Sequence, residues 1–464
     1  MKTVSQRALT ALAAAAALSL SLSTQANPAL VDASLKNHES HYVASQVLVQ
    51  FRAGQMADAR EAALTHLGAK SIKVLRSALQ RADGRGDLHL VSLPKNLKVA
   101  DAIRKLRNSA AVEFAEPNWT YTTQAKGVDP YYADGKLWGM YGDNSPLQTN
   151  QYGSQAGEAF AAGKKCKSSV IVGIIDEGMM PNHPDTQANV WVNPFEIPGN
   201  GIDDDGNGYI DDVNGWDFVS NDNTPFDGVG DDHATHVSGT IGAVGNNATG
   251  VAGICSAVKM ISAKFLGAQG GTTADGILAI DYITDLKTLH GLNIVATNNS
   301  WGGGAFSQAM QDAIERANAA NILFMAAAGN GNILGRGLDN DKKANYPSNY
   351  PNDNIIAVAA ITKTGTKAGF SNWGLTTVDI GAPGADIWST VPTLVGGVVT
   401  GGYASYDGTS MATPHVTGAA ALYASLHPGS TAAQIKAAIL NSAVPTPSLA
   451  GKTVTGGRLD VSGF

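Results

Sequence analysis

Five short runs of Val, Ile and Ala between residues 170 and 360 constrain the fold more than any other feature of the sequence. The runs are Val170–Ile175, Val258–Phe265, Ile294–Asn298, Ile322–Ala327 and Ile355–Ala360. Continuous apolar runs of this length are typical of strands that are buried on both faces, as in a parallel sheet. Helical patterns such as Gly276–Leu289 and Ser307–Ala319 lie between them. The sequence therefore predicts an α/β fold with a doubly wound, mostly parallel sheet.

The first 26 residues have the pattern of a secretory signal peptide. Positive charge at Lys2 and Arg7 precedes the apolar stretch Ala8–Leu22. Small residues, Thr24 and Ala26, then stand at positions −3 and −1 before a cut after Ala26. We expect a secreted protein, in the extracellular medium or the periplasm; a buried N-terminal helix is the alternative. No apolar run reaches the ~18–20 residues of a membrane span, so no such span is expected.

Residues 27–125 show the pattern of a small α+β domain. Strands are predicted at Gln46–Phe51, Ser71–Leu75, Leu88–Leu93 and Val112–Tyr121, and helices at Ala57–His66 and Val99–Asn108. The order βαββαβ is that of a ferredoxin-like unit. This segment has 13 basic and 9 acidic residues, a net charge of +4, whereas residues 126–464 have 17 and 30, a net charge of −13. The pattern alone leaves open whether the unit is a binding module or a pro-segment that docks on its acidic neighbour.

The charge of the whole chain argues against a nucleic-acid partner. Charged residues make up 15% of the sequence and the net charge is −7. Proteins that bind nucleic acid neutralise phosphates with a basic surface, and no such partner is expected here.

Three motifs far apart in the sequence supply the side chains of nucleophilic catalysis. Asp176 ends the run Val170–Ile175, His233 stands at the start of a helical pattern, and Ser410 opens the apolar helix that runs to Leu426. A serine hydroxyl is a poor nucleophile unless a base removes its proton, and the base needs a third group that fixes its tautomer. Each residue alone has an ordinary structural interpretation, but together they predict a hydrolase.

The motif Tyr406–His415, with the sequence YDGTSMATPH, makes the chain similar to the subtilisin family of serine proteases, the subtilases. The similarity extends over about residues 129–464, and subtilisin has the same Asp, His, Ser order. The resemblance implies that Ser410 is the nucleophile, His233 the general base and then acid, and Asp176 the orienting carboxylate. It implies peptide hydrolysis through an acyl-serine intermediate.

The resemblance also implies an oxyanion site and a substrate cleft. The segment Ala326–Asn330 is similar to the family segment whose Asn donates a hydrogen bond to the oxyanion, which assigns that role to Asn330. Substrate-binding positions are implied for Ser300, Trp301, Gly302, Ala328 and Gly329. Pairing with extended backbone favours broad protein and peptide substrates. Trp301 could equally be a residue of the core.

Two residues depart from the family pattern. Glu177 follows the catalytic Asp, where the family usually has Ser or Thr, and Ala234 follows the catalytic His, where Gly is usual. A second carboxylate near His233 stabilises its charged form and is expected to raise its pKa. Neither change removes a catalytic group, so activity is expected to survive both.

An acidic segment, residues 201–212, is the best candidate for a metal site. Its alternating oxygen side chains resemble the start of a calcium loop, with Asn214 where a bidentate Glu would stand. The predicted ligands are Asp203, Asp205, Asn207, Asp211 and the carbonyl of Tyr209. Calcium with a structural role is expected; a solvated acidic turn is the alternative. Asn246–Val251 resembles a second subtilase calcium loop.

The sequence has two cysteines, Cys166 and Cys255, and each precedes a predicted parallel strand. An even count in an exported chain favours a disulfide, on the condition that the two Cα atoms lie within about 7 Å. Both cysteines are expected at the amino ends of the sheet, away from the catalytic edge. His236 and His415 are expected to be structural histidines.

Given the resemblance, the βαββαβ segment, which closes with Val112–Asn118, is similar to the inhibitor-type propeptide of subtilases. This implies a propeptide at residues 27–125 and a peptidase domain at 126–464. The propeptide would assist folding, block the cleft and be removed by self-cleavage between about Tyr121 and Asp129. We therefore expect a monomeric, secreted serine endopeptidase made as a zymogen. The alternatives are a binding protein that kept the fold and a peptide ligase.

Overall fold

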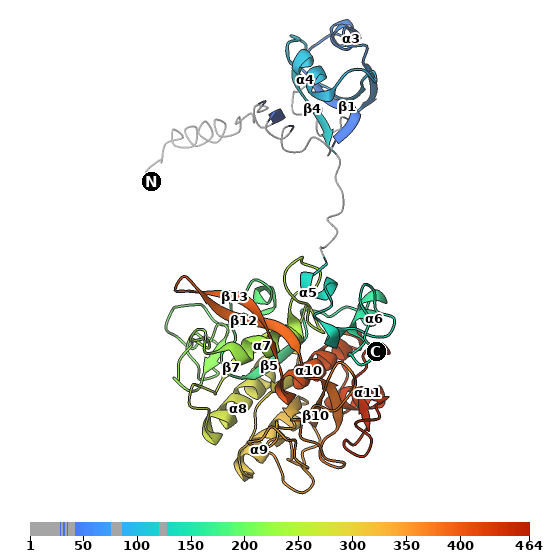
Figure 1. Ribbon diagram of the computed structural model, residues 1–464. Coiled ribbons are helices and arrows are strands. Elements are labelled where there is room, and N and C mark those ends of the chain that lie inside the picture. Colours follow the sequence, from blue (N-terminus) through green and yellow to red (C-terminus); the bar gives the residue numbers. More distant parts are fainter. Residues whose placement is uncertain (1–27, 29–30, 33–34, 36–41, 76–85, 120–127) are drawn as a thin grey trace, which may run out of the picture. The chain divides into compact units, whose positions relative to one another are not determined.

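The structure, a computed structural model, describes residues 28, 31–32, 35, 42–75, 86–119 and 128–464 (Figure 1). The chain divides into two compact units, residues 1–125 and 126–464. The predicted signal peptide lies outside the described residues, and so does most of the segment in which the propeptide cut is predicted. Within the described part of the chain, no helix is both long and apolar enough to cross a membrane.

The first unit has the predicted ferredoxin-like order. Its elements are β1 (Tyr42–Phe51), α3 (Ala57–Thr65), β2 (Lys70–Val74), β3 (Leu88–Ser92), α4 (Val99–Arg107) and β4 (Val112–Trp119). The strands form an antiparallel sheet in the order β2-β3-β1-β4. The buried side chains of α4, Val99, Ala102, Ile103 and Leu106, recur at helical spacing and form one apolar face. The predicted βαββαβ unit is thus confirmed, although β1 begins four residues earlier than predicted.

The second unit is built on a sheet of nine strands. These are β5 (Ile171–Asp176), β6 (Gly215–Asp217), β7 (Lys259–Lys264), β8 (Ile294–Asn299), β9 (Leu323–Ala327), β10 (Ile355–Ile361), β11 (Ile380–Pro383), β14 (Val444–Pro445) and β15 (Gly457–Arg458). Their order is β14-β15-β11-β10-β9-β8-β5-β7-β6, and every pairing except β14 with β15 is parallel. The five predicted strands are all present.

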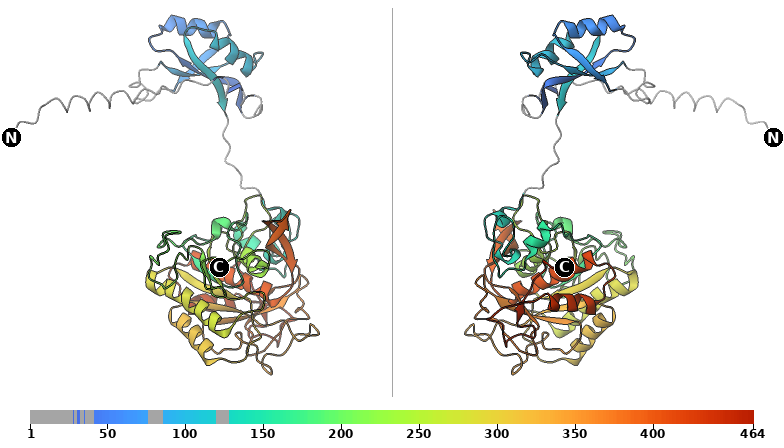
Figure 2. Two further views of the ribbon diagram at one scale, coloured as in Figure 1. Left: turned by 90° about the vertical axis from the view of Figure 1, so that its left-hand side faces the viewer. Right: turned by 90° about the vertical axis from the view of Figure 1, so that its right-hand side faces the viewer.

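Helices cover both faces of this sheet (Figure 2). The longer ones are α7 (Asp232–Gly242), α8 (Thr273–His290), α9 (Gln308–Ala319), α10 (Thr409–Leu426) and α11 (Ala432–Asn441); α5 (Pro130–Ala133), α6 (Ala156–Ala161) and the 3₁₀ turns Trp138–Met140 and Gln187–Asn189 are short. In β5, Val172 and Ile174 pack with α7 and α10, whereas Ile171 and Ile175 pack with α8 and α9. The predicted doubly wound α/β fold is confirmed.

A two-stranded ribbon, not predicted from the sequence, packs on α7. It consists of β12 (Ile387–Val395) and β13 (Val398–Tyr406), which pair antiparallel from Ile387 opposite Tyr406 to Val395 opposite Val398. Gly396 and Gly397 form the two-residue turn, and both have positive φ (59° and 83°), as a type I′ turn requires. The ribbon leads directly into the segment that contains Ser410 (Figure 1).

The strand order predicts a ligand crevice at the end of β5. This strand pairs with β7 on one side and with β8 on the other. The chain continues from β5 to β6 and β7 on the first side and then crosses over to β8 on the second, so the strand order reverses its direction here. In open parallel sheets, ligands bind outside the carboxyl ends of the strands at such a point. Asp176 is the last residue of β5 and therefore lies at this edge.

Candidate active site

Asp176 and His233 form a hydrogen-bonded pair at the carboxyl edge of the sheet. His233 is the second residue of α7, and its Nδ1 lies 2.8 Å from Asp176 Oδ1. Asp176 is fully buried, and the same oxygen accepts a hydrogen bond from the Glu177 amide at 2.7 Å. With Nδ1–H donated to the carboxylate, Nε2 of His233 is left to accept a proton, as a general base must.

Ser410 is the second residue of α10 and is held by Ser300. The Ser410 hydroxyl donates to the Ser300 carbonyl at 2.9 Å, and the Ser300 hydroxyl donates to the Ser410 carbonyl at 2.8 Å. Ser300, predicted as a substrate-binding residue, is thus in direct contact with the predicted nucleophile. Proton transfer to His233 requires the Ser410 hydroxyl to turn away from Ser300, a rotation about one side-chain bond.

The side-chain amide of Asn330 is oriented by Thr409. Its Oδ1 accepts hydrogen bonds from the Thr409 amide at 2.8 Å and from the Thr409 hydroxyl at 2.9 Å. The NH₂ group of Asn330 is left as a donor, and it lies 3.5 Å from the position that a Cβ on Gly408 would occupy. Asn330 can therefore donate a hydrogen bond close to Ser410. Thr409 was not singled out from the sequence, although it lies in the serine motif.

Of the other predicted substrate-binding residues, two glycines lie beside Asn345, and Ala328 and Trp301 pack inside the molecule. A Cβ on Gly302 or on Gly329 would lie within 3.1 Å of the Asn345 side chain, so Asn345 lies beside both glycines. Gly329 also has a φ of +105°, which favours glycine. Ala328 is buried. The ring of Trp301 packs edge-on against Phe265, with 4.8 Å between centroids, which favours the core interpretation of this residue.

Glu177 joins the end of β5 to the start of α7. Its Oε2 accepts a hydrogen bond from the backbone N–H of His233 at 3.1 Å. Burial and the adjacent Asp176 carboxylate raise the pKa of Glu177 to about 7. Ala234, the second departure from the family pattern, is fully buried inside α7.

The charge around His233 favours its protonated form. Burial lowers the pKa of His233, but the hydrogen-bonded Asp176 carboxylate and the nearby Glu177 and Asp232 carboxylates raise it by more, to about 9. The cation Lys264 is engaged with other carboxylates, at 2.5 Å from Asp231 and 3.2 Å from Asp227. The expected effect of Glu177 on the His233 pKa is in the direction predicted from the sequence.

His236 and His415 are buried and bond to backbone carbonyls. His236 Nε2 lies 2.9 Å from the Ile387 carbonyl, and His415 Nδ1 lies 2.9 Å from the Met411 carbonyl. Burial lowers the pKa of His236 to about 3 and that of His415 to about 4. Both side chains are therefore neutral near pH 7, which suits the structural roles expected for them.

The structure brings together only part of the predicted calcium loop. Carboxylate oxygens of Asp203, Asp205 and Glu196 lie within 4.8 Å of one another. Glu196 was missed because it lies outside the spacing pattern. Asp211 is directed elsewhere: its carboxylate accepts hydrogen bonds from the amides of residues 199, 200 and 201. Three converging carboxylates repel one another, and their hard oxygens suit Ca²⁺, so this smaller group of residues fits the ion.

The side chains at two other predicted ligand positions pack within the protein; the predicted ligand atom of Tyr209 is its backbone carbonyl, which is not involved in the ring contact. The Asn207 amide donates to Asp205 at 3.2 Å and to Asp212 at 2.9 Å. The Tyr209 ring packs against Trp216, with 5.0 Å between centroids.

Two carboxylates converge on the second predicted loop, residues 246–251. Asp129 accepts hydrogen bonds from the amides of Asn246 and Asn247. Asp185 accepts from the Asn247 side chain and from the Val251 amide, both at 2.8 Å. Both carboxylates are therefore satisfied by donors of the protein.

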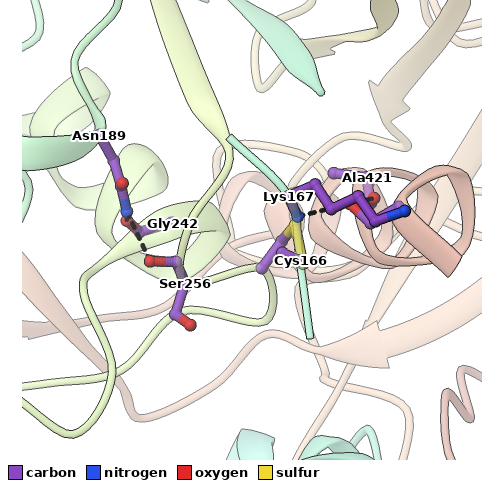
Figure 3. Close-up of a disulfide and its surroundings, with 8 residues drawn as sticks. Cys166, Lys167, Asn189, Gly242, Ser256 and Ala421 are labelled. Atoms are coloured by element: carbon purple, nitrogen blue, oxygen red, sulfur yellow. Dashed lines mark hydrogen bonds between the residues drawn. A yellow bond between two sulfur atoms is a disulfide. The ribbon is translucent and has the colours of Figure 1, made fainter. Parts of the chain in front are cut away.

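Cys166 and Cys255 form a disulfide, with 5.3 Å between their Cα atoms (Figure 3). It joins the segment before β5 to the loop before β7, at the amino ends of these strands, as predicted. Nearby, the Asn189 amide donates to the carbonyls of Gly242 and Ser256, each at 2.7 Å. The end of α7 is thereby fastened to the loop that contains Cys255.

Comparison with known proteins identifies both units. A model of the subtilase family matches residues 167–460, and a model of the fervidolysin N-terminal prodomain matches residues 28–118. Thermitase from Thermoactinomyces vulgaris is 35% identical over 307 residues, which cover 65% of this chain and 92% of thermitase. A thermophilic serine proteinase from Bacillus sp. (strain AK1) is 31% identical over 396 residues, 84% of this chain and 80% of the relative. A solved protease structure from Pseudoalteromonas arctica PAMC 21717 matches with a TM-score of 0.56 and 26% identity, over 73% of this chain and 98% of that one.

Proposed function

Since the chain belongs to the subtilase family and is a serine protease with an N-terminal prodomain, we propose that it is a secreted endopeptidase, made as a zymogen, in which Asp176, His233 and Ser410 form the catalytic triad. The observation that best supports the triad is the 2.8 Å hydrogen bond between His233 and the buried Asp176, at the sheet edge where a crevice is expected.

The acylation step follows from the roles of the three residues. Ser410 Oγ attacks the carbonyl carbon of the peptide bond while His233 Nε2 takes the hydroxyl proton. Asp176 holds Nδ1 and stabilises the imidazolium that forms. The tetrahedral intermediate collapses, the C–N bond breaks, and His233 gives its proton to the leaving amine. The acyl group remains on Ser410.

Water completes the reaction. A water molecule attacks the acyl-Ser410 carbonyl, His233 takes its proton, and the proton then returns to Ser410 as the carboxylic acid leaves. A peptide ligase would instead pass the acyl group to an amine. The ratio of hydrolysis to transfer in the presence of an added amine distinguishes the two activities.

Asn330 supplies a hydrogen bond to the oxyanion in both steps. An amide suits this role because it donates to developing negative charge without titrating. An extended substrate would pair with two segments, one that contains Ser300 and Gly302 and one that contains Ala328 and Gly329. The ring of Trp301 packs against Phe265 and would support the first segment from inside the molecule. Backbone pairing of this kind accepts many protein and peptide sequences.

We assign the propeptide to residues 27–125 and the monomeric peptidase to residues 126–464, after a signal peptide at residues 1–26. The opposite net charges of the two segments, +4 and −13, support docking of the propeptide on the peptidase. One relative, from Xanthomonas campestris, is named an extracellular protease, which supports secretion.

Calcium is the cofactor that we propose, with a structural role. Glu196, Asp203 and Asp205 would hold the ion, and the ion would supply the positive charge that offsets their mutual repulsion.

The test is Ser410→Ala in the full chain, expressed in a protease-free host. The variant is expected to keep its propeptide and to leave casein intact, whereas the wild type loses the propeptide and cleaves casein. Ser220→Ala, at an exposed serine, is the matched control and is expected to behave as the wild type. A Ser410→Ala chain that still matures and cleaves casein would refute the assignment.

A further inference from the structure

The β12–β13 ribbon connects the element that carries His233 to the segment that carries Ser410 (Figure 1). Side chains of β12 bind the backbone of α7: the Ser389 hydroxyl donates to the His236 carbonyl at 2.6 Å, and the Thr390 hydroxyl donates to the Thr235 carbonyl at 2.7 Å. The partner strand, β13, ends at Tyr406, four residues before Ser410. The ribbon therefore fixes α7 relative to the serine segment.

Tyr406, at the end of β13, contacts the residue that precedes the proposed catalytic histidine. Its hydroxyl donates to Asp232 Oδ2, and Asp232 is both the first residue of α7 and the neighbour of His233. The Tyr406 ring stacks on the His236 ring, with 4.5 Å between centroids and 9° between planes. Burial and the Asp232 carboxylate raise the pKa of Tyr406 well above its ordinary value. The hydroxyl therefore keeps its proton and remains a donor.

The chain between Tyr406 and Ser410 is fastened at successive residues. The Gly408 amide donates to the Gly384 carbonyl at 2.8 Å, and the Thr409 amide donates to Asn330 at 2.8 Å. Since this short segment is held at both ends, a shift of Asp232 relative to Tyr406 would change the separation of His233 and Ser410.

We propose that Tyr406 and Asp232 are a positioning pair that sets this separation for proton transfer. The proposal rests on the triad proposed above. The Ser410 hydroxyl bonds to Ser300 in this structure and must turn toward His233 before it can give up its proton. The rate of proton transfer therefore depends on the position of the His233 imidazole. Misplacement of a catalytic group by about 1 Å can cost about 100-fold in rate.

The test compares variants that break the bond with one that keeps it. Tyr406→Phe and Asp232→Ala are expected to lower kcat about 10- to 100-fold, with KM within about 3-fold of the wild type. Asp232→Asn keeps a carbonyl acceptor for Tyr406, and its kcat, compared for all variants at a pH above the acid limb where His233 is neutral, is expected to stay within about 3-fold of the wild type. Tyr406→Phe/Asp232→Ala is expected to be no slower than Asp232→Ala. Full-length chains are expressed, and matured active sites are counted with a serine-directed phosphonate, so that kcat refers to folded enzyme.

Tyr403→Phe is the matched control. Tyr403 lies on the same strand, and its hydroxyl, like that of Tyr406, is close enough to a buried carboxylate, here Asp185, for the carboxylate to raise its pKa. This variant is expected to lower the unfolding temperature about as much as Tyr406→Phe does, without lowering kcat. The positioning role is overturned if the kcat of Tyr406→Phe equals that of the wild type. It is also overturned if kcat falls as far in Asp232→Asn as in Asp232→Ala, or as far in Tyr403→Phe as in Tyr406→Phe. An inactive wild type would overturn the proposed function and this role with it.

Discussion

Glu177, which departs from the pattern expected of subtilases, bonds directly to the proposed catalytic histidine. It accepts the His233 N–H and, with Asp176 and Asp232, raises the pKa of the imidazole. Only neutral His233 can act as a base, so activity should appear as the pH rises through this pKa. A carboxylate at position 177 therefore moves the acid limb of the pH profile to higher pH.

Glu177→Gln is predicted to move the acid limb of kcat/KM to lower pH. Gln keeps an acceptor for the His233 N–H but removes the negative charge that favours imidazolium. Because Glu177 itself has a pKa raised to about 7, the wild-type limb should be broader than a one-proton titration, and the variant limb should be sharper. The measurement is a pH series with a peptide substrate, with Glu315→Gln on α9 as the control. An unchanged limb, or one moved to higher pH, would contradict the role of Glu177.

Asn330→Ala is predicted to lower kcat by ~10²–10³ with little change in KM, because an oxyanion donor acts in the transition state. Steady-state kinetics of matured enzyme test this. An increase in KM at unchanged kcat would instead assign Asn330 to substrate binding.

At the scale of single residues, the sequence predicted those that stand in long local motifs and missed those that act through tertiary contacts. Asp176, His233 and Ser410 each stand in such a motif. Thr409 orients Asn330 from a segment 79 positions away, and Glu196 joins the acidic cluster from outside the alternating pattern. No local spacing signals either contact.

At the scale of elements, the buried parallel strands were predictable because burial on both faces leaves a continuous apolar run. The β12–β13 ribbon was missed because most of β13 is only half-buried and its sequence contains Gly401 and Gly402. The two glycines between Val395 and Val398 were the available signal, since this pair favours a type I′ hairpin turn.

The acidic loop is predicted to stabilise the enzyme only when calcium is bound. A ligand at about 100 times its Kd adds about 2.7 kcal/mol to the free energy of unfolding, so EDTA should lower the unfolding temperature of the wild type. Glu196→Gln should reduce the difference between calcium and EDTA, whereas Asp204→Asn, at the exposed neighbour outside the cluster, should keep it. Calorimetry in the calcium and EDTA buffers measures the unfolding temperatures of the wild type and of both variants. Equal calcium dependence in wild type and Glu196→Gln would exclude this cluster as the site.

At the scale of the whole molecule, the disulfide closes a long loop far along the strands from the catalytic edge. Cys166 and Cys255 are 89 residues apart, and a cross-link of this span is worth about 4–5 kcal/mol in the chain-entropy model. Cys166→Ser/Cys255→Ser should therefore lose roughly 2–5 kcal/mol of stability in urea unfolding and keep its kcat at 25 °C. A large loss of kcat in folded enzyme would show that the bond also shapes the active site.

The two-unit organisation followed from the change of pattern and of charge along the sequence. A βαββαβ segment with a net charge of +4 precedes an α/β segment with a net charge of −13. The fold class of each unit was predictable because the order of helices and strands limits how strands pair, whereas the order of the nine strands in the large sheet was not predicted. The ribbon's attachment to α7, which brings distant segments together, depends on side-chain contacts that no periodicity encodes.

The central claim is that Ser410 is the nucleophile of a serine endopeptidase, and covalent labelling tests it most directly. Matured wild-type enzyme is treated with a fluorophosphonate, residual casein hydrolysis is measured, and the modified residue is located by peptide mass spectrometry. We predict one adduct, on Ser410, that forms in step with the loss of activity and is absent from His233→Ala. Loss of activity with the adduct on another residue, or full activity with Ser410 modified, would contradict the claim.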